Sequence, residues 1–166
     1  MAILLAIPIL GLLIIFQSAI LSQVHLLQGS IDFVLLVLVA WAVQERVKTA
    51  WHWAVIAALL TSLVSAMPVW AILAGYLAAT GAALLLRRVF WQRPLFAMIA
   101  ATFIGTLMIH AISILTLRLM GTPLPLIESL NLVTLPSALL NLLLAIPVYA
   151  VLGDLASWLY PVEIEM

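Results

Sequence analysis

The stretch "PSALLNLLLAIPVYAVL", residues 136–152, decides which class of fold this chain adopts. It places an amide, Asn141, and a proline, Pro147, inside a run of leucine, alanine, isoleucine and valine. In a non-polar medium the amide must find a hydrogen-bond partner, typically on another helix. The proline has no N–H to donate to the carbonyl of Leu143, so a bend is expected there. The stretch therefore predicts a transmembrane helix in which Asn141 locks helices together and Pro147 shapes the bundle.

The whole chain has the same apolar character. Of its 166 residues, 67% are hydrophobic and 7% are charged, and the mean hydropathy is +1.36. A soluble domain is about half apolar and about a quarter charged, so this chain has too few polar residues to cover a surface that faces water. The net charge is zero, with no basic patch to suggest nucleic acid, and the lack of cysteine excludes disulfides and thiol chemistry. The composition predicts a single all-α domain, 1–166, embedded in a membrane.

Polar residues divide the chain into six apolar segments, which predict six transmembrane helices. The first segment lacks the Lys or Arg of a secretory signal, so it is expected to be a retained span. A helix needs ~20 apolar residues to cross the hydrocarbon. The second and third segments are shorter, so they are expected either to thin the bilayer or to hold their ends against other helices. Thr134 is expected to cap the last helix. The expected spans are 3–22, 31–44, 51–67, 69–86, 95–117 and 133–157.

The positive charges are divided unequally between the expected loops. With the N-terminus in the cytoplasm, the loops at 45–50 and 87–94 face the cytoplasm and carry five of the six positive residues, against one in the outer loop at 118–132. Cytoplasmic loops are enriched in Lys and Arg, so both termini are predicted to be cytoplasmic. Aromatic residues lie mostly near the predicted span ends, as in a belt at the membrane surface; they are Trp41, Trp51, Trp53, Trp70, Trp91, Trp158, Tyr149 and Tyr160.

Three titratable residues stand out. Asp32 opens the second span, where it is interpreted as a helix cap or, alternatively, as a contact or ion site. Arg46 is interpreted as a solvated charge that sets topology, or as a contact for a cytoplasmic partner. His110 lies about two turns inside the fifth span, by the ~1.5 Å rise per residue. An ionisable group at that depth suggests function, but no other His, Asp or Glu lies deep in a span, which favours a neutral His110 hydrogen-bonded to another helix.

Small residues recur at four-residue spacing in the fourth and fifth spans, and Gly75, Ala79 and Gly105 belong to these stripes. Such stripes let helices approach closely, either inside the bundle or against another protein's span, and the sequence does not separate the two. No enzyme motif and no pair of carboxylates within a span is present, so no catalytic residue, cofactor or metal is expected. The partner-binding or helix-packing candidates are Asp32, Arg46, Gly75, Ala79, Gly105, His110, Asn141 and Pro147.

The order of these features resembles the bacterial rod shape-determining protein family MreD, over about residues 25–155. The shared features are an acidic residue before a Leu-rich second span, an aromatic and basic first cytoplasmic loop, a Gly-Tyr pair in a small-residue fourth span, and a last span with Ser, Asn and a Pro before Tyr. The matching residues are Asp32, Trp41, Arg46, Gly75, Tyr76, Ser137, Asn141, Pro147 and Tyr149. Many relatives carry an acidic residue near the outer end of the third span, where this chain has Thr61, Ser62 and Ser65, so no role of that carboxylate is carried over.

The resemblance implies a non-enzymatic scaffold of the cell-elongation (Rod) complex in the bacterial inner membrane, with membrane lipid around it. Such a subunit binds the single-span protein MreC, and through it connects to the RodA glycosyltransferase, its transpeptidase partner and MreB. It thereby helps to regulate peptidoglycan synthesis and to maintain rod cell shape. The implied fold resembles the six-helix substrate-binding subunits of energy-coupling-factor transporters. The alternative function is that of a vitamin-binding subunit of such a transporter, which would need polar groups converging on an outward pocket.

Overall fold

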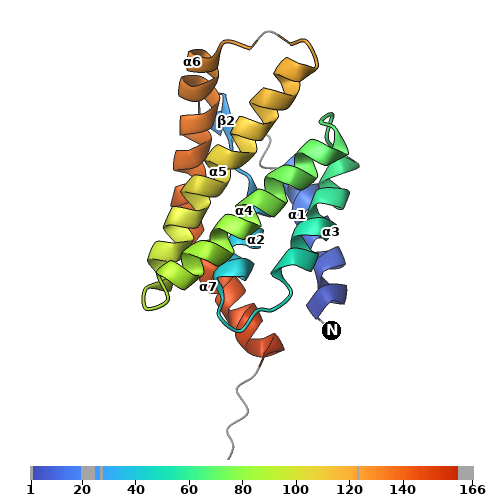
Figure 1. Ribbon diagram of the computed structural model, residues 1–166. Helices are drawn as coiled ribbons and strands as arrows, with labels where there is room; N and C mark the ends of the chain where they lie inside the picture. The colour runs from blue at the N-terminus through green and yellow to red at the C-terminus, as the bar shows by residue number, and fades with distance from the viewer. Residues whose placement is uncertain (1, 20–24, 27, 123, 161–166) are drawn as a thin grey trace, which may run out of the picture.

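The computed structural model describes the chain except for residues 1, 20–24, 27, 123 and 161–166, so the end of the expected first span lies outside the described residues. The described part is mostly helical (Figure 1). By length and composition, three helical stretches could cross a membrane: α4 (Val69–Val89), α5 (Pro94–Leu119) and the continuous stretch Leu126–Leu159. Three further helices are shorter: α1 (Ala2–Ala19), α2 (Phe33–Val43) and α3 (Ala50–Ser62). The architecture fits an all-α membrane protein, and the crossing of six helices stays a prediction.

The connections between helices lie at two ends of the bundle. Figure 1 shows the start of α1, the loop from α2 to α3, the turn from α4 to α5 and the end of the last helix at one end. The turns that follow α3 and α5 lie at the opposite end. Five of the six positive residues belong to the first end and Arg118 to the other. The positive charges that underlie the predicted orientation are therefore concentrated at one end of the bundle.

Helix α2 lies at the centre of the bundle, where it contacts α1, α3, α4, α5 and the last helix. All ten residues from Val34 to Val43 are buried. A helix buried on every side is expected to be apolar all round rather than along one stripe. This explains why α2 is an unbroken apolar run in which Val, Leu and Ala are joined by Phe33 and Trp41.

An arginine from α4 closes the end of α2. Arg87 Nη1 donates hydrogen bonds to the carbonyl oxygens of Ala42 at 3.1 Å, Gln44 at 2.9 Å and Val47 at 3.3 Å. The last carbonyl groups of a helix have no partner within the helix, and a positive charge there suits the helix dipole. Arg87, expected from the sequence only as a charge that sets topology, therefore also fastens α2 to α4.

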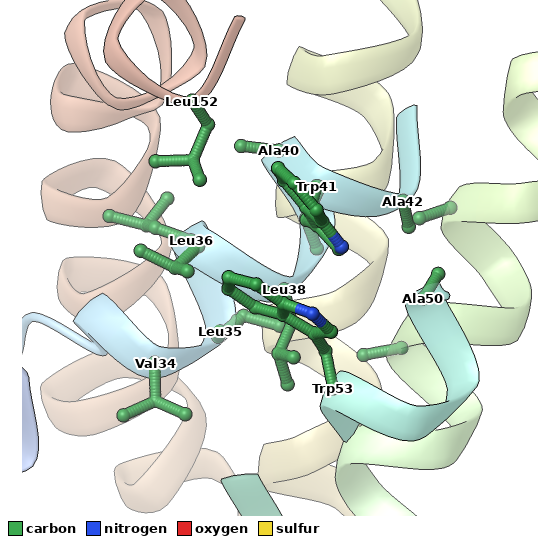
Figure 2. Packing of buried hydrophobic residues seen from close by; sticks show 14 of the residues in the cluster. Val34, Leu35, Leu36, Leu38, Ala40, Trp41, Ala42, Ala50, Trp53 and Leu152 are labelled. Atoms are coloured by element: carbon green, nitrogen blue, oxygen red, sulfur yellow. The ribbon is translucent and has the colours of Figure 1, made fainter. Parts of the chain in front are cut away.

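The aromatic-belt prediction is wrong for Trp41 and Trp53, which are fully buried. Their rings stack with centroids 4.4 Å apart, joining α2 to α3 (Figure 2). The indole N–H of Trp41 donates to Thr49 Oγ1 at 3.3 Å, which satisfies its one polar atom. A tryptophan near a span end has the same sequence signature whether it faces lipid headgroups or a neighbouring helix. The tryptophans that are exposed are Trp51, Trp70, Trp91 and Trp158.

The last helical stretch begins earlier than the sequence predicts. It consists of α6 (Leu126–Ser129), a π-helical turn η2 (Leu130–Thr134) and α7 (Leu135–Leu159). The predicted outer loop is therefore wrong in its second half, and so is the cap by Thr134, whose backbone is helical and whose side chain makes no capping bond. Within this stretch, Pro136 has no N–H to donate to the carbonyl of Leu132. That carbonyl instead accepts the N–H of Gln28 at 3.0 Å.

Gln28 belongs to a short hairpin that packs against the start of α7. Strands β1 (His25–Leu26) and β2 (Gly29–Ser30) pair antiparallel, and the N–H of Ser30 donates to Ser137 Oγ at 3.0 Å. A Cβ atom at Gly29 would lie 2.6 Å from Ser137 N and 2.9 Å from the carbonyl carbon of Pro136. Backbone atoms cannot move aside easily, so only glycine fits between the hairpin and the helix.

We expect Arg87→Gln to destabilise the protein by about 2 kcal/mol, because hydrogen bonds from a charged group to the end of α2 are lost. For a chain of this size that corresponds to a melting temperature lower by about 4–8 °C in detergent. Arg88→Gln is the matched control, since Arg88 is the next residue and is exposed. Equal melting temperatures for the two variants would show that Arg87 does not hold α2.

We expect Gly29→Ala to destabilise the protein by about 1–3 kcal/mol, the range for overpacking in a tight contact. Gly11→Ala is the control, because a Cβ at Gly11 in α1 would meet nothing within 4 Å. In a helix that substitution is expected to be neutral or to stabilise by up to about 1 kcal/mol. The measurement is the melting temperature of both variants in the same detergent. If Gly29→Ala is as stable as Gly11→Ala, the close contact between the hairpin and α7 is contradicted.

Candidate functional site

The start of α2 brings together polar side chains from several helices. Asp32 precedes the first residue of α2, and its own N–H donates to Asn141 Oδ1 of α7 at 2.9 Å. The other end of the amide, Asn141 Nδ2, donates to Thr106 Oγ1 of α5 at 3.1 Å. A backbone N–H can only donate, so the orientation of the amide follows from its partners. Asn141 is fully buried and links α2, α5 and α7.

The next two N–H groups of α2 are taken by a residue of α1. Gln17 Oε1 accepts the N–H of Phe33 at 2.9 Å and that of Val34 at 3.4 Å. Gln17 was assigned no role from the sequence, so this contact was not predicted. The sequence did contain the relevant feature, a single amide in an apolar span. Such an amide needs a hydrogen-bond partner, and this holds for Gln17 as it does for Asn141.

The carboxyl group of Asp32 completes the cap, as the helix-cap interpretation predicts. Its Oδ1 accepts the N–H of Leu35 at 2.9 Å, and the hydroxyl of Tyr76 on α4 lies 3.5 Å from each carboxyl oxygen. With Asn141 and Gln17, all four N–H groups from Asp32 to Leu35 have acceptors. We call Gln17, Asp32, Tyr76, Thr106 and Asn141 the capping cluster. In a medium without water, a helix can begin only where each of its first N–H groups has such an acceptor.

The capping cluster has one carboxyl group and no second acid beside it. Among the residues that the structure describes, no three His, Asp or Glu side chains come together in a way that could hold a metal ion. Acid–base catalysis by a carboxylate pair needs two such groups within reach of one substrate. The arrangement in the described part of the chain therefore positions helices and gives no specific support to a catalytic role.

The small-residue candidates lie inside the bundle, where helices meet. A Cβ at Gly75 would lie 3.3 Å from Ile109 Cγ1 of α5. A Cβ at Gly105 would lie 3.2 Å from Leu35 Cδ1 and 3.3 Å from the Cβ of Ala79. Gly75, Ala79 and Gly105 are all buried. They let α4 and α5 approach each other and α2, so their contacts in this chain are those of internal packing.

The remaining candidates lie apart from the capping cluster. Arg46 is exposed in the loop between α2 and α3. His110 Nδ1 lies 3.1 Å from Thr134 Oγ1, a hydrogen bond between α5 and the π-helical turn. Pro147 is exposed on α7, roughly a third of a turn from Asn141 at the ~3.6-residue period. The structure thus joins Asp32 with Asn141 and keeps Arg46, His110 and Pro147 separate from them.

Pro147 borders an apolar groove between α1, α2 and α7, with a volume of about 470 Å³. We call it the α1–α7 groove. Every residue that lines it is apolar, and on α7 the lining extends from Leu144 to Leu155. Its lining residues are Ile9, Leu13, Phe33, Val37, Leu144, Pro147, Val148, Val151, Leu152 and Leu155.

We expect Asn141→Leu to destabilise the protein by about 1–3 kcal/mol, because it leaves the buried N–H of Asp32 without an acceptor. Asn131→Leu is the control, since Asn131 is an exposed amide in η2. The measurement is thermal unfolding in detergent, with the yield of monodisperse protein as a second readout. Similar stabilities of the two leucine variants would contradict the role of Asn141 in capping α2.

No family model, curated protein or solved structure matches the chain. Its function is therefore inferred from the residues and contacts described above.

Proposed function

We propose that the chain is a non-enzymatic scaffold of the cell-elongation (Rod) complex, embedded in the bacterial inner membrane with both termini in the cytoplasm. In this role it binds the single-span protein MreC and through it connects to RodA, the transpeptidase partner of RodA and MreB. The consequence is control of peptidoglycan synthesis and of rod shape. The starting point is the resemblance to the MreD family carried by residues such as Asp32, Tyr76 and Asn141.

The observation that carries the proposal is the α1–α7 groove. Its lining on α7 covers eleven residue steps, from Leu144 to Leu155, which is about 16 Å or three helical turns. Helices associate in membranes by close apolar packing, so a partner helix needs no polar group here. A polar solute would find no hydrogen-bonding side chain among the lining residues. The groove therefore suits one face of a single transmembrane helix.

The capping cluster supports a scaffold rather than a carrier of solutes. Gln17, Asp32 and Asn141 direct their polar atoms at the start of α2 and at one another's helices. These groups stabilise the bundle and hold α2 in place beneath the groove, to which Phe33 and Val37 contribute. A rigid floor lowers the cost of docking, because less conformational freedom is lost on binding.

The alternative function, a vitamin-binding subunit, finds less support in the described part of the chain. Several hydroxyl groups do converge on one cavity, which is lined in part by Thr61, Ser65, Tyr76 and Ser113. Its volume is about 140 Å³, below the ~300 Å³ at the lower end of small-molecule pockets. Tight binding of a vitamin by the purified protein would favour this alternative over the scaffold.

We expect Val151→Trp to reduce co-purification of MreC severalfold, because the indole fills the α1–α7 groove. Leu143→Trp is the matched control: both side chains are exposed on α7, but only Val151 lines the groove. Expression and melting temperature should be the same for both, which separates binding from folding. Equal recovery of MreC with the two variants would rule out this groove as the binding site.

Depletion of the protein from a rod-shaped host should round the cells. The Val151→Trp variant should restore rod shape poorly and Leu143→Trp fully, when both are expressed at the level of the unchanged protein. Cells that keep their shape after depletion, together with no recovery of MreC, would refute the proposed function as a whole.

A further inference from the structure

A second groove lies between α5 and the helical segment that follows it, on the side of the molecule where His110 meets Thr134. A cavity of about 310 Å³ lies here, and its α5 wall includes Leu107, Ala111, Leu115 and Arg118. These positions follow one another at three- or four-residue spacing, so they form a single stripe along the helix. The stripe covers eleven residue steps, or about 16 Å. We call this the α5–α6 groove.

Its far wall comes from Leu126, Leu130 and Thr134. Leu126 and Leu130 are exposed apolar side chains, and so is Leu115 on the facing helix. The hydrogen bond between His110 Nδ1 and Thr134 Oγ1 gives a partner to polar atoms on both walls. Pairing of this kind lowers the cost of placing hydrocarbon beside them. The interior of the groove therefore suits an apolar chain.

The outer end of the groove is different, because it carries a positive charge. Arg118 is exposed, and its Nη2 donates to the carbonyl of Leu124 at 2.7 Å. A guanidinium has five N–H donors, so others remain for a ligand. None of the residues that line this cavity or its neighbour on the other side of His110 is acidic. The acidic residue of α6, Glu128, is exposed and lines neither cavity, so no lining carboxylate neutralises the charge at the mouth.

We propose that the α5–α6 groove binds a membrane lipid with an anionic phosphate headgroup, with Arg118 on the phosphate and one acyl chain along Leu115 and Ala111 toward His110. Both the length of the groove and the charge at its mouth match such a lipid. A stripe three turns long matches an extended hydrocarbon chain, and a guanidinium matches a phosphate in charge and hydrogen-bonding geometry. The site is separate from the α1–α7 groove, so the lipid proposal stands independently of the binding of MreC.

The chain has no cysteine, so a single introduced thiol can report on the groove. Ala111→Cys places the reporter in the lining, and Leu85→Cys on the exposed face of α4 is the control thiol. The experiment measures the rate of thiol modification of each detergent-solubilised full-length variant as phosphatidylglycerol is added. Phosphatidylcholine and inorganic phosphate are the comparison ligands. We expect phosphatidylglycerol to slow modification at Ala111→Cys, to need a lower concentration than phosphatidylcholine, and to leave Leu85→Cys unchanged.

Arg118→Gln, added to Ala111→Cys, should raise the concentration of phosphatidylglycerol for half-protection about fivefold, the effect of one basic residue near anionic lipid. Arg88→Gln at the other end of the bundle should not change it, and Arg118→Lys should lie between. Each variant is first shown to have an unchanged melting temperature. Equal protection by the two lipids, equal effects of Arg118→Gln and Arg88→Gln, or no protection at all would overturn the proposal. Protection by inorganic phosphate alone would replace the lipid with a free anion.

Discussion

The structure depends on helix α2, which is buried among the other helices along all but its first residue. Helix α2 has ten consecutive buried residues, and a helix leaves four N–H groups and four carbonyl groups without partners at its ends. In a medium without water each such group would cost free energy if left unpaired. Side chains from α1 and α7 and the preceding Asp32 pair with the N–H groups at the start of α2, and Arg87 of α4 pairs with the carbonyl groups of Ala42 and Gln44 at its end.

The same contacts fix the positions of the surrounding helices. Asn141 can accept the N–H of Asp32 only when α7 is correctly positioned along α2. In the same way, Gln17 can accept the N–H of Phe33 only when α1 is correctly positioned. In the hairpin, the N–H of Gln28 pairs with the carbonyl of Leu132 in η2, which Pro136 leaves without a partner, and Ser137 of α7 accepts the N–H of Ser30 in β2. Once the helices are fixed around α2, the α1–α7 groove and the α5–α6 groove are the recesses that remain between neighbouring segments.

Several features could be predicted from the sequence because they follow from local chemistry. The cap by Asp32 and the cross-helix hydrogen bond of Asn141 both agree with the structure. The role of Gln17 was missed, although its cost in an apolar span was visible. The role of Arg87 was hidden by its position, since a basic residue after a span also has the ordinary function of setting topology.

Composition, apolar run length and the cost of buried polar groups are properties of the chain alone, so the membrane-protein class, most helical segments and the residues that need a partner could be read from the sequence. Which partners these residues find depends on the tertiary structure. Trp41 and Trp53 stack inside instead of facing the membrane surface, and the last helix continues through the expected loop. Both outcomes depend on which segments lie side by side, and that is set by packing and hydrogen-bond pairing between residues far apart in the chain.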